Sequence, residues 1–258
     1  MSGLRRAGEQ LRADLLVFVR TPAAMFFTAI LPIIFMVLFV AIFGNETDKK
    51  LHIKVSTLQV PAFIALAVTS ASFLGLAIGL VRGREDGVFK RVRGTPVPIA
   101  VVFGGRVGVA ITSAMAVSVL LLVIGGVLYG VELQTARVPA LIVTLAVGAT
   151  ALSAVGIAYS RLIPSFDAAP AMTNAVVLPL YFISGVFVPT SQLPHWLAQV
   201  ASVFPIKPLN DALFACFDPR ASGNGLQLGK LAVLAAWGIG ALLLAVRTFS
   251  WVPRRDAE

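Results

Sequence analysis

Ionic side chains gather at one interior place in an otherwise apolar sequence, the stretch 82–98, which reads RGREDGVFKRVRGTPVP. Apolar runs long enough to cross a bilayer lie on both sides of it. Ionic contacts of both signs can fix the register of a protein–protein contact, so the chemistry that this stretch suggests is recognition of a partner protein. The alternative is a solvated loop, because loops beside spans generally collect Lys and Arg. The ionic residues are Arg82, Arg84, Glu85, Asp86, Lys90, Arg91 and Arg93.

The order of the charges favours partner recognition, because it predicts a short helix over residues 84–93. Glu85 and Asp86 suit the first turn of this helix and the basic residues that follow suit its last turn, since each charge then complements the nearer pole of the helix dipole. Gly94 would end the helix. A short capped helix with both charge signs suits docking to a protein better than lying on anionic lipid.

Few residues in the chain could carry out catalysis or bind a metal. The single cysteine, Cys216, allows no internal disulfide, and His52 and His195 are the only histidines. The sequence has no G-x-x-x-x-G-K-[ST] phosphate loop, because its only Gly-Lys pair, 229–230, is followed by Leu231. The motifs H-E-x-x-H and G-x-S-x-G do not occur either. We therefore expect no enzyme activity, no metal site and no cofactor bound by this chain.

The composition is that of a polytopic membrane protein. Hydrophobic residues make up 58% of the 258 residues and charged residues only 13%, with a mean hydropathy of +0.90. The net charge of +9 does not indicate nucleic-acid binding, because the basic residues lie at the ends of apolar runs and form no basic face interleaved with aromatic residues. Lipid headgroups and membrane orientation explain these charges.

The apolar runs predict an all-α protein, with a single transmembrane domain over 1–258 that contains six transmembrane helices. An amphipathic segment at 4–20 is expected to lie on the membrane as an interfacial helix. The segment 190–215 is too rich in proline to cross as one helix, so we expect an external re-entrant segment with a half-embedded helix, whose Trp196 lies at the interface. The six expected spans are 23–43, 58–80, 97–129, 139–159, 169–188 and 228–251.

The distribution of basic residues predicts the orientation in the membrane, and one expected span contains a basic residue. Thirteen Lys and Arg residues lie on the side of the N-terminus and seven on the other side, which places both termini in the cytoplasm. Arg106 is the one basic residue inside an expected span. We expect it to snorkel to the interface, with contact to a substrate or partner as the alternative.

Two sequence stretches carry a resemblance to a known family. Residues 84–87 (REDG) and 95–97 (TPV) are similar to the R-E-x-G and T-P-V pattern of the permease subunits of type-two ATP-binding-cassette (ABC) exporters, such as the daunorubicin-resistance permeases. Val88 and Phe89 stand where that family commonly has Thr and Leu. The second stretch is 183–205, in which ISGVFVP, LPHWL and FP resemble the family's S-G-x-x-x-P, L-P-x-W-L and later proline segments.

The resemblance implies a permease that moves an amphiphilic substrate outward, driven by ATP and Mg bound in a separate ATPase subunit. The helix at 84–93 would be the coupling helix, and the external segment a gate. A second permease chain, the inner membrane and its lipid are implied as well. The residues implied in ATPase contact are Arg84, Glu85, Asp86, Gly87, Val88, Phe89, Lys90, Arg91 and Val92. The residues implied in the external gate are Ser184, Gly185, Pro189, Leu193, Pro194, Trp196, Leu197 and Pro205.

Two other classes of protein fit the sequence less well. An ion-coupled secondary transporter normally places acidic residues or histidine inside its spans, whereas Glu132, Asp167 and Asp211 fall at expected loops or ends. A membrane-embedded enzyme would need one of the missing catalytic motifs. Drug, lipid and glycan exporters share the plan, so all three substrate classes stay open, as do pairing with an identical and with a sister permease chain.

Overall fold

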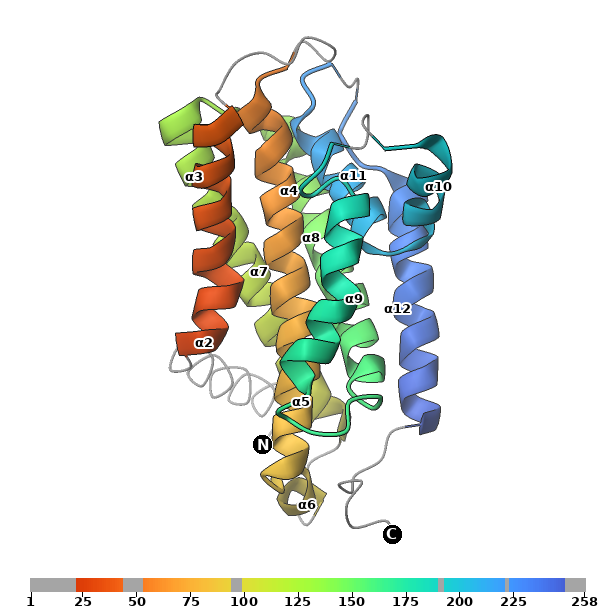
Figure 1. Cartoon of the computed structure of the whole chain (residues 1–258). Coiled ribbons are helices and arrows are strands. Elements are labelled where there is room, and N and C mark those ends of the chain that lie inside the picture. The colour runs from red at the N-terminus through yellow and green to blue at the C-terminus, as the bar shows by residue number, and fades with distance from the viewer. Residues whose placement is uncertain (1–21, 44–52, 94–98, 190–192, 221–222, 249–258) are drawn as a thin grey trace, which may run out of the picture.

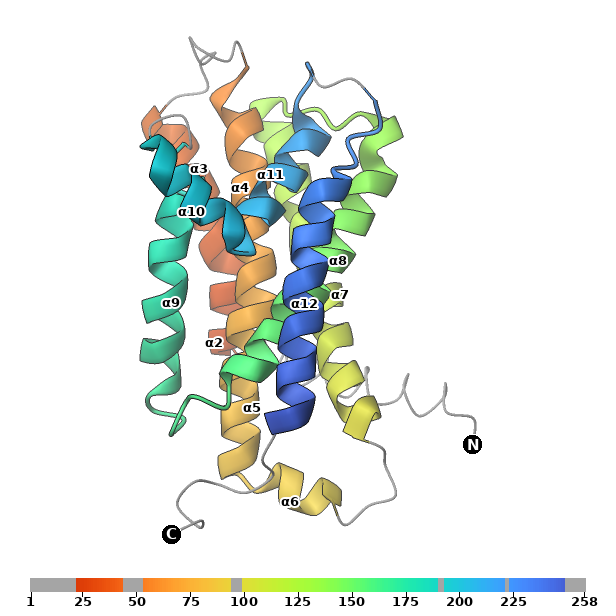
Figure 2. The same ribbon diagram turned by 90° about the vertical axis from the view of Figure 1, so that its right-hand side faces the viewer.

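The computed structural model describes residues 22–43, 53–93, 99–189, 193–220 and 223–248. In these ranges the chain is a bundle of helices without a β-strand, which confirms the all-α prediction. The long helices run along one common direction, with a short helix at one end and a bent helix pair at the other (Figure 1, Figure 2). The expected interfacial helix, 4–20, lies outside the described residues.

The first helix covers the expected span 23–43 and contains a wide turn. It joins α2 (Pro22–Met25), the π-helical turn η1 (Phe26–Ile30) and α3 (Leu31–Phe43). Met36 is fully buried on one face while Ile42 is exposed on another, as expected for a helix at the edge of a bundle in lipid.

The second helix lies at the centre of the bundle. It joins α4 (Val55–Thr69), the π-helical turn η2 (Ser70–Leu74) and α5 (Gly75–Glu85) into one helix of 31 residues. Every residue from 60 to 73 is buried. A helix that is apolar all round suits such a position, because every face meets another helix. The expected span 58–80 lies inside this helix, which continues beyond it by more than a turn.

The predicted helix over 84–93 is wrong in its start. Arg84 and Glu85 are the last residues of α5, and a separate helix, α6 (Val88–Arg93), follows them. Gly87 separates the two helices: its φ of 66° is left-handed, and its N–H donates to the carbonyl oxygen of Arg84. The acidic pair therefore lies at the C-terminal end of α5, because a glycine stop outweighs the charge pattern from which the helix start was predicted.

The third and fourth helices lie at the expected spans 97–129 and 139–159, of which residues 97 and 98 are outside the described residues. They are α7 (Ile99–Tyr129) and α8 (Val138–Tyr159), and a 3₁₀ turn, η3 (Thr135–Arg137), precedes α8. At about 1.5 Å per residue α7 is longer than a hydrocarbon core of about 30 Å. Its first turns therefore lie beyond the core or tilt within it.

The fifth helix, α9 (Ala169–Ile183), is shorter than the expected span 169–188. Its 15 residues rise about 22 Å, less than a hydrocarbon core. The helix ends there because Ser184 leaves the helical conformation and Gly185 has a φ of 83°, which favours glycine.

A bent helix pair follows α9 at the end of the bundle opposite to α6 (Figure 1, Figure 2). It consists of α10 (His195–Val203) and α11 (Ile206–Phe217), which meet at 97°. The last helix, α12 (Leu228–Thr248), then returns along the bundle. Because α9 ends and α12 begins at the same end, the pair enters and leaves on one side of the bundle, as a re-entrant segment would, and we call it the re-entrant pair. The helix that we expected to carry Trp196 is α10. The second helix, α11, is a buried helix that the sequence analysis did not predict.

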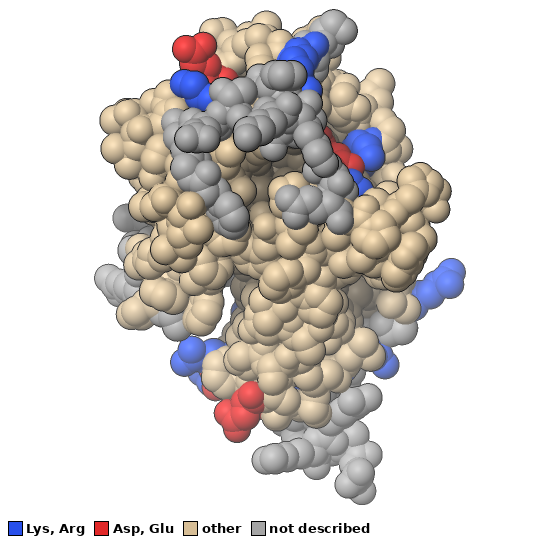
Figure 3. Space-filling model, turned by 45° about the horizontal axis from the view of Figure 1, so that its top comes forward, with Lys and Arg blue, Asp and Glu red and all other residues tan. Residues whose placement is uncertain are grey.

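Four described helices are long and apolar enough to cross a membrane, or five if the bent pair counts as one span. The expected number of six depends on two shorter apolar helices, Phe26–Ile42 and Ala169–Ile183. On the face seen in Figure 3, few described charged residues lie in the middle of the molecule, and most lie toward its two ends.

A close backbone contact fixes α8 against the centre of the bundle. A Cβ atom added to Gly156 would lie 2.8 Å from the carbonyl oxygen of Phe73 and 3.2 Å from its Cα, both in the π-helical turn η2. Backbone atoms cannot move aside as a flexible side chain can. Only glycine therefore allows this approach of α8 to the central helix.

Gly156→Ala should lower the thermal unfolding temperature of the purified protein in detergent, because overpacking of this kind costs about 1–3 kcal/mol. Gly104→Ala in α7 is the matched control, since a Cβ at Gly104 meets nothing within 4 Å. The control should be neutral or slightly stabilising, because alanine is the better helix former. Equal unfolding temperatures for the two variants would contradict the contact.

Candidate functional site

The end of α5 is fastened to the connection between α8 and α9, residues 160–168. Arg84 Nη2 donates a hydrogen bond of 2.6 Å to the carbonyl oxygen of Ile163. The backbone N–H of Phe166 donates one of 2.7 Å to Glu85 Oε1, and the Arg82 guanidinium lies 5.5 Å from the centre of the Phe166 ring. Two of the residues expected to contact an ATPase, Arg84 and Glu85, therefore hold the chain's own fourth and fifth helices in place.

Phe89 anchors α6 to the bundle. Its ring is 2% exposed, stacks on Phe103 of α7 at 6.4 Å and lies against Gly83 of α5. We predicted that Phe89 offers apolar contact to a partner, whereas in this conformation its ring is buried within the chain. Its burial instead joins α6 to both α5 and α7.

Arg106, which we expected to snorkel to the membrane interface, extends its guanidinium to α5 and to Phe89 of α6. It is half-buried, its Nη1 donates a hydrogen bond of 3.2 Å to the carbonyl oxygen of Gly79, and its guanidinium lies 5.4 Å from the centre of the Phe89 ring. A cation over an aromatic face and a backbone acceptor together satisfy the buried charge. Arg106 therefore completes the junction of α5, α6 and α7.

The remaining residues predicted to contact the ATPase lie on the surface of α6 or in the turn between α5 and α6. Asp86 and Arg91 are exposed, Val88 and Gly87 are partly exposed, and the side chains of Lys90 and Val92 lie outside the described part. Arg91 Nη2 donates to the Asp86 carbonyl oxygen at 3.0 Å, and the Asp86 carboxylate lies 3.6 Å from Arg82. Asp86, Val88 and Arg91, together with the exposed Glu85 at the end of α5, thus form the accessible part of the predicted docking surface.

The predicted gate residues Ser184 and Gly185 directly follow α9, and Ser184 contacts α11. Ser184 is fully buried, and its carbonyl oxygen accepts a hydrogen bond of 3.0 Å from Asn210 Nδ2 of α11. After the Gly185 turn, Phe187 packs at 5.6 Å from the Phe35 ring and 5.9 Å from the Phe39 ring of α3. These contacts join the first helix, α9 and the re-entrant pair.

The other gate residues lie on α10 and at the bend. Pro194 directly precedes α10, and Pro205 is buried at the start of α11. Trp196 is 65% exposed, and Leu193 and Leu197 are partly exposed. Pro189, which precedes the undescribed residues 190–192, is exposed as well. Ser184, Gly185 and Pro205 thus pack into the bundle. The face of α10 that carries Trp196 points away from it.

Arg137 lies between the expected spans 97–129 and 139–159, where the sequence suggested a loop, but its side chain is only 2% exposed. Its Nη1 donates to the carbonyl oxygens of Ala215 and Asp218 at the C-terminal end of α11. A cation there compensates both the unpaired carbonyls and the negative pole of the helix. The apolar spacing of Ile206, Leu209 and Leu213 was the signal that could have revealed the helix it caps.

Asp211, expected at a loop or helix end, lies within α11 between two lysines. Lys207 Nζ donates to its two carboxylate oxygens at 3.0 and 3.1 Å, and Lys230 Nζ of α12 donates at 2.9 Å. The shared carboxylate joins α11 to α12. Among the described residues, no three His, Cys, Asp or Glu side chains form a group that could hold a metal ion.

Comparison with known proteins agrees with the sequence resemblance. The family model described as "ABC-2 type transporter" matches residues 10–217, which include α6, the α8–α9 connection and the re-entrant pair. The chain belongs to the ABC-2 type transporter family. It is therefore a transport subunit of the ABC-2 type, which implies association with an ABC ATPase subunit.

Curated relatives support the same ABC-2 assignment. The chain is 24% identical over 183 residues to the inner membrane transport permease YadH of Escherichia coli K12, a match that covers 69% of this chain and 71% of the relative. The protein of the same name from Shigella flexneri matches with the same identity and coverage.

Glu85→Ala should speed hydrogen–deuterium exchange at the Phe166 amide, because the variant removes the carboxylate that accepts this N–H. We expect an increase of about two- to tenfold, as for loss of one modest hydrogen bond. Mass spectrometry of a peptide that covers residues 160–168 measures it. Asp86→Ala is the control, since that carboxylate faces Arg82; equal exchange in the two variants would contradict the Glu85 contact.

Proposed function

We propose that this chain is the permease of an ABC exporter and moves an amphiphilic drug, lipid or glycan outward. A separate subunit binds ATP and Mg and hydrolyses the ATP. The observation that carries the proposal is the junction at the α6 end, where one short helix is joined to α5 and α7 through Phe89 and Arg106. Displacement of α6 by a partner would therefore move α5 and α7 with it.

The exposed residues of this junction form the proposed ATPase contact. Asp86 and Arg91 would fix the register of the partner through opposite charges, and Val88 would add apolar contact. Arg84, which is partly buried, and the exposed Glu85 would pass the displacement to the α8–α9 connection. Phe89 would keep α6 from moving independently of α5.

The displacement would reach the outer end through the central helix. This helix is continuous from α5 to α4, and α4 packs against α11. Tyr181 of α9 donates a hydrogen bond of 3.4 Å to the carbonyl oxygen of Leu66 in α4, so α9 is joined to the same helix. The re-entrant pair would then serve as an outer gate, with Ser184, Gly185 and Pro205 at its base and α10 at its outer surface.

We further propose an inner-membrane location with both termini in the cytoplasm. The location follows the name of the YadH relatives, and the orientation follows the distribution of thirteen against seven basic residues. A second permease chain, identical or a sister, would complete the membrane part of the transporter together with surrounding lipid.

Reversing the charge of Asp86 and Arg91 together, as Asp86→Arg with Arg91→Glu, should lower the amount of copurifying ATPase subunit about tenfold, because contacts of like charge replace complementary ones. Insertion should be unchanged, since both side chains are exposed. Because ATP is supplied by the cytoplasm, this result would also place the α6 end there.

The control for this charge reversal is Lys54→Glu with Glu132→Lys, a matched reversal of two exposed residues that lie far from α6 in the chain. Full ATPase recovery with the Asp86/Arg91 variant would refute the docking surface. Transport by the purified chain in ATP-free vesicles under a proton gradient would refute the ABC mechanism and favour an ion-coupled transporter.

Trp196→Asp with Leu197→Asp should reduce export or uncouple it from ATP hydrolysis while the ATPase still binds. The two apolar side chains would each contribute about 1.5–3 kcal/mol by burial in the membrane, and charge would expel α10. Gln199→Asp, on an exposed position of the same helix, is the control. A normal export rate with the double variant would show that α10 is not part of a gate.

A further inference from the structure

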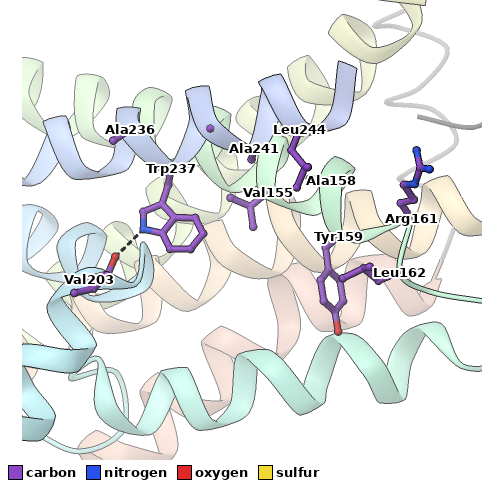
Figure 4. A pocket seen from close by; sticks show the side chains of 11 residues that line it. Val155, Ala158, Tyr159, Arg161, Leu162, Val203, Ala236, Trp237, Ala241 and Leu244 are labelled. Carbon is purple, nitrogen blue, oxygen red and sulfur yellow. Dashed lines mark hydrogen bonds between the residues drawn. The ribbon is translucent and has the colours of Figure 1, made fainter. Parts of the chain in front are cut away.

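An apolar groove lies over α8, beside α12 and below the end of α10. Its volume is about 670 Å³, within the range of sites that hold small molecules. Val155 and Ala158 of α8 line its floor, Ala241 and Leu244 of α12 one wall, and Val203 one end (Figure 4). The lining extends along α12 from residue 236 to 244, about 12 Å.

The two ends of the groove differ in chemistry. At one end the Trp237 indole N–H donates a hydrogen bond of 2.6 Å to the carbonyl oxygen of Val203. At the other end is Arg161, which follows α8 on the α6 side of the bundle (Figure 4). Arg161 is exposed, and its guanidinium has no hydrogen bond or ion pair to any residue that the structure describes.

We propose that this groove binds a phospholipid with an anionic headgroup. The acyl chain lies along α8 and α12, and the phosphate accepts hydrogen bonds from Arg161. The groove has an apolar lining except near Arg161, so it excludes a polar ligand from most of its length. A guanidinium offers paired donors that match phosphate oxygens, whereas an uncharged end would not select a charged headgroup.

The surroundings of the groove identify the membrane as the source of this ligand. The outer face of α12 next to the groove is made of exposed aliphatic side chains, including Ile239, Leu243 and Val246. Such a face meets acyl chains, so a lipid enters the groove sideways without crossing water. The headgroup then lies in the leaflet on the α6 side, at the level of Arg161.

The lysines at the opposite end of the bundle do not offer an equivalent headgroup site. Lys207 and Lys230 do not line the groove, and both are bonded to the Asp211 carboxylate. Arg161 is therefore the charged residue of the groove that is available to an anionic lipid.

Trp237 is a natural probe of the groove. The chain has three tryptophans, so Trp196→Phe with Trp251→Phe leaves Trp237 alone. The full chain is placed in phosphatidylcholine nanodiscs that contain a small fraction of either brominated phosphatidylglycerol or brominated phosphatidylcholine. The anionic lipid should quench Trp237 fluorescence about two- to fivefold more strongly at equal mole fraction, as expected for one exposed ion pair.

Two variants with matched controls decide between groove binding and general attraction of lipid. Arg161→Gln should remove the advantage of the anionic lipid, whereas Arg247→Gln, an exposed charge of α12 outside the groove lining, should keep it. Gly240→Leu should also remove it by filling the groove, whereas Gly229→Leu should not. A Cβ meets nothing within 4 Å at either glycine, so both variants should fold.

Equal quenching by the two lipids would overturn the proposal. An advantage that survives Gly240→Leu would overturn it as well, because the lipid would then surround the protein without entering the groove. The measurement needs no ATPase subunit, so its failure would leave the proposed transport function untouched.

Discussion

The arrangement of the whole bundle depends on the burial of one helix, the continuous α4–η2–α5. Its backbone groups bond within the helix, and every side chain from 60 to 73 is covered by neighbours. No other route is open to a backbone deep in a membrane, since water is not available to satisfy it. Because α5 extends to Glu85 without a break, the junction at α6 and the core of the bundle are parts of the same rigid element.

Polar side chains hold the ends of the bundle, where water and lipid headgroups replace hydrocarbon. Arg84 and Glu85 bond to the α8–α9 connection on one side, and Arg137 and Asp211 bond α11 to its neighbours on the other. Most of these partners are backbone carbonyls or N–H groups. Such contacts depend on the position of the chain more than on the identity of the partner residue, so they can persist through small movements of the helices.

The sequence was sufficient for the broad plan, because hydropathy reports directly on burial in lipid. It predicted the helices 99–129 and 138–159 closely, and it predicted that a helix carries Trp196. It failed where a local signal competed with a tertiary one. The charges around Glu85 suggested a helix start although Gly87 ended the preceding helix, and Phe89 seemed suited to a partner although it fills space between α5 and α7. α11 was missed because five nearby prolines suggested a loop, whereas its apolar face and the Arg137 cap stabilise a helix.

The π-helical turn η2 has a consequence for the angular phase of the central helix. A π turn accommodates an additional residue, and one residue corresponds to about 100° of rotation about the helix axis. α5 is therefore rotated, relative to a straight continuation of α4, by the presence of residues 70–74. Deleting one residue there would preserve composition, hydropathy and length almost unchanged. It would nevertheless turn Arg84 and Glu85 away from the α8–α9 connection. A single residue in η2 therefore determines which side of α5 faces the other helices at the α6 end.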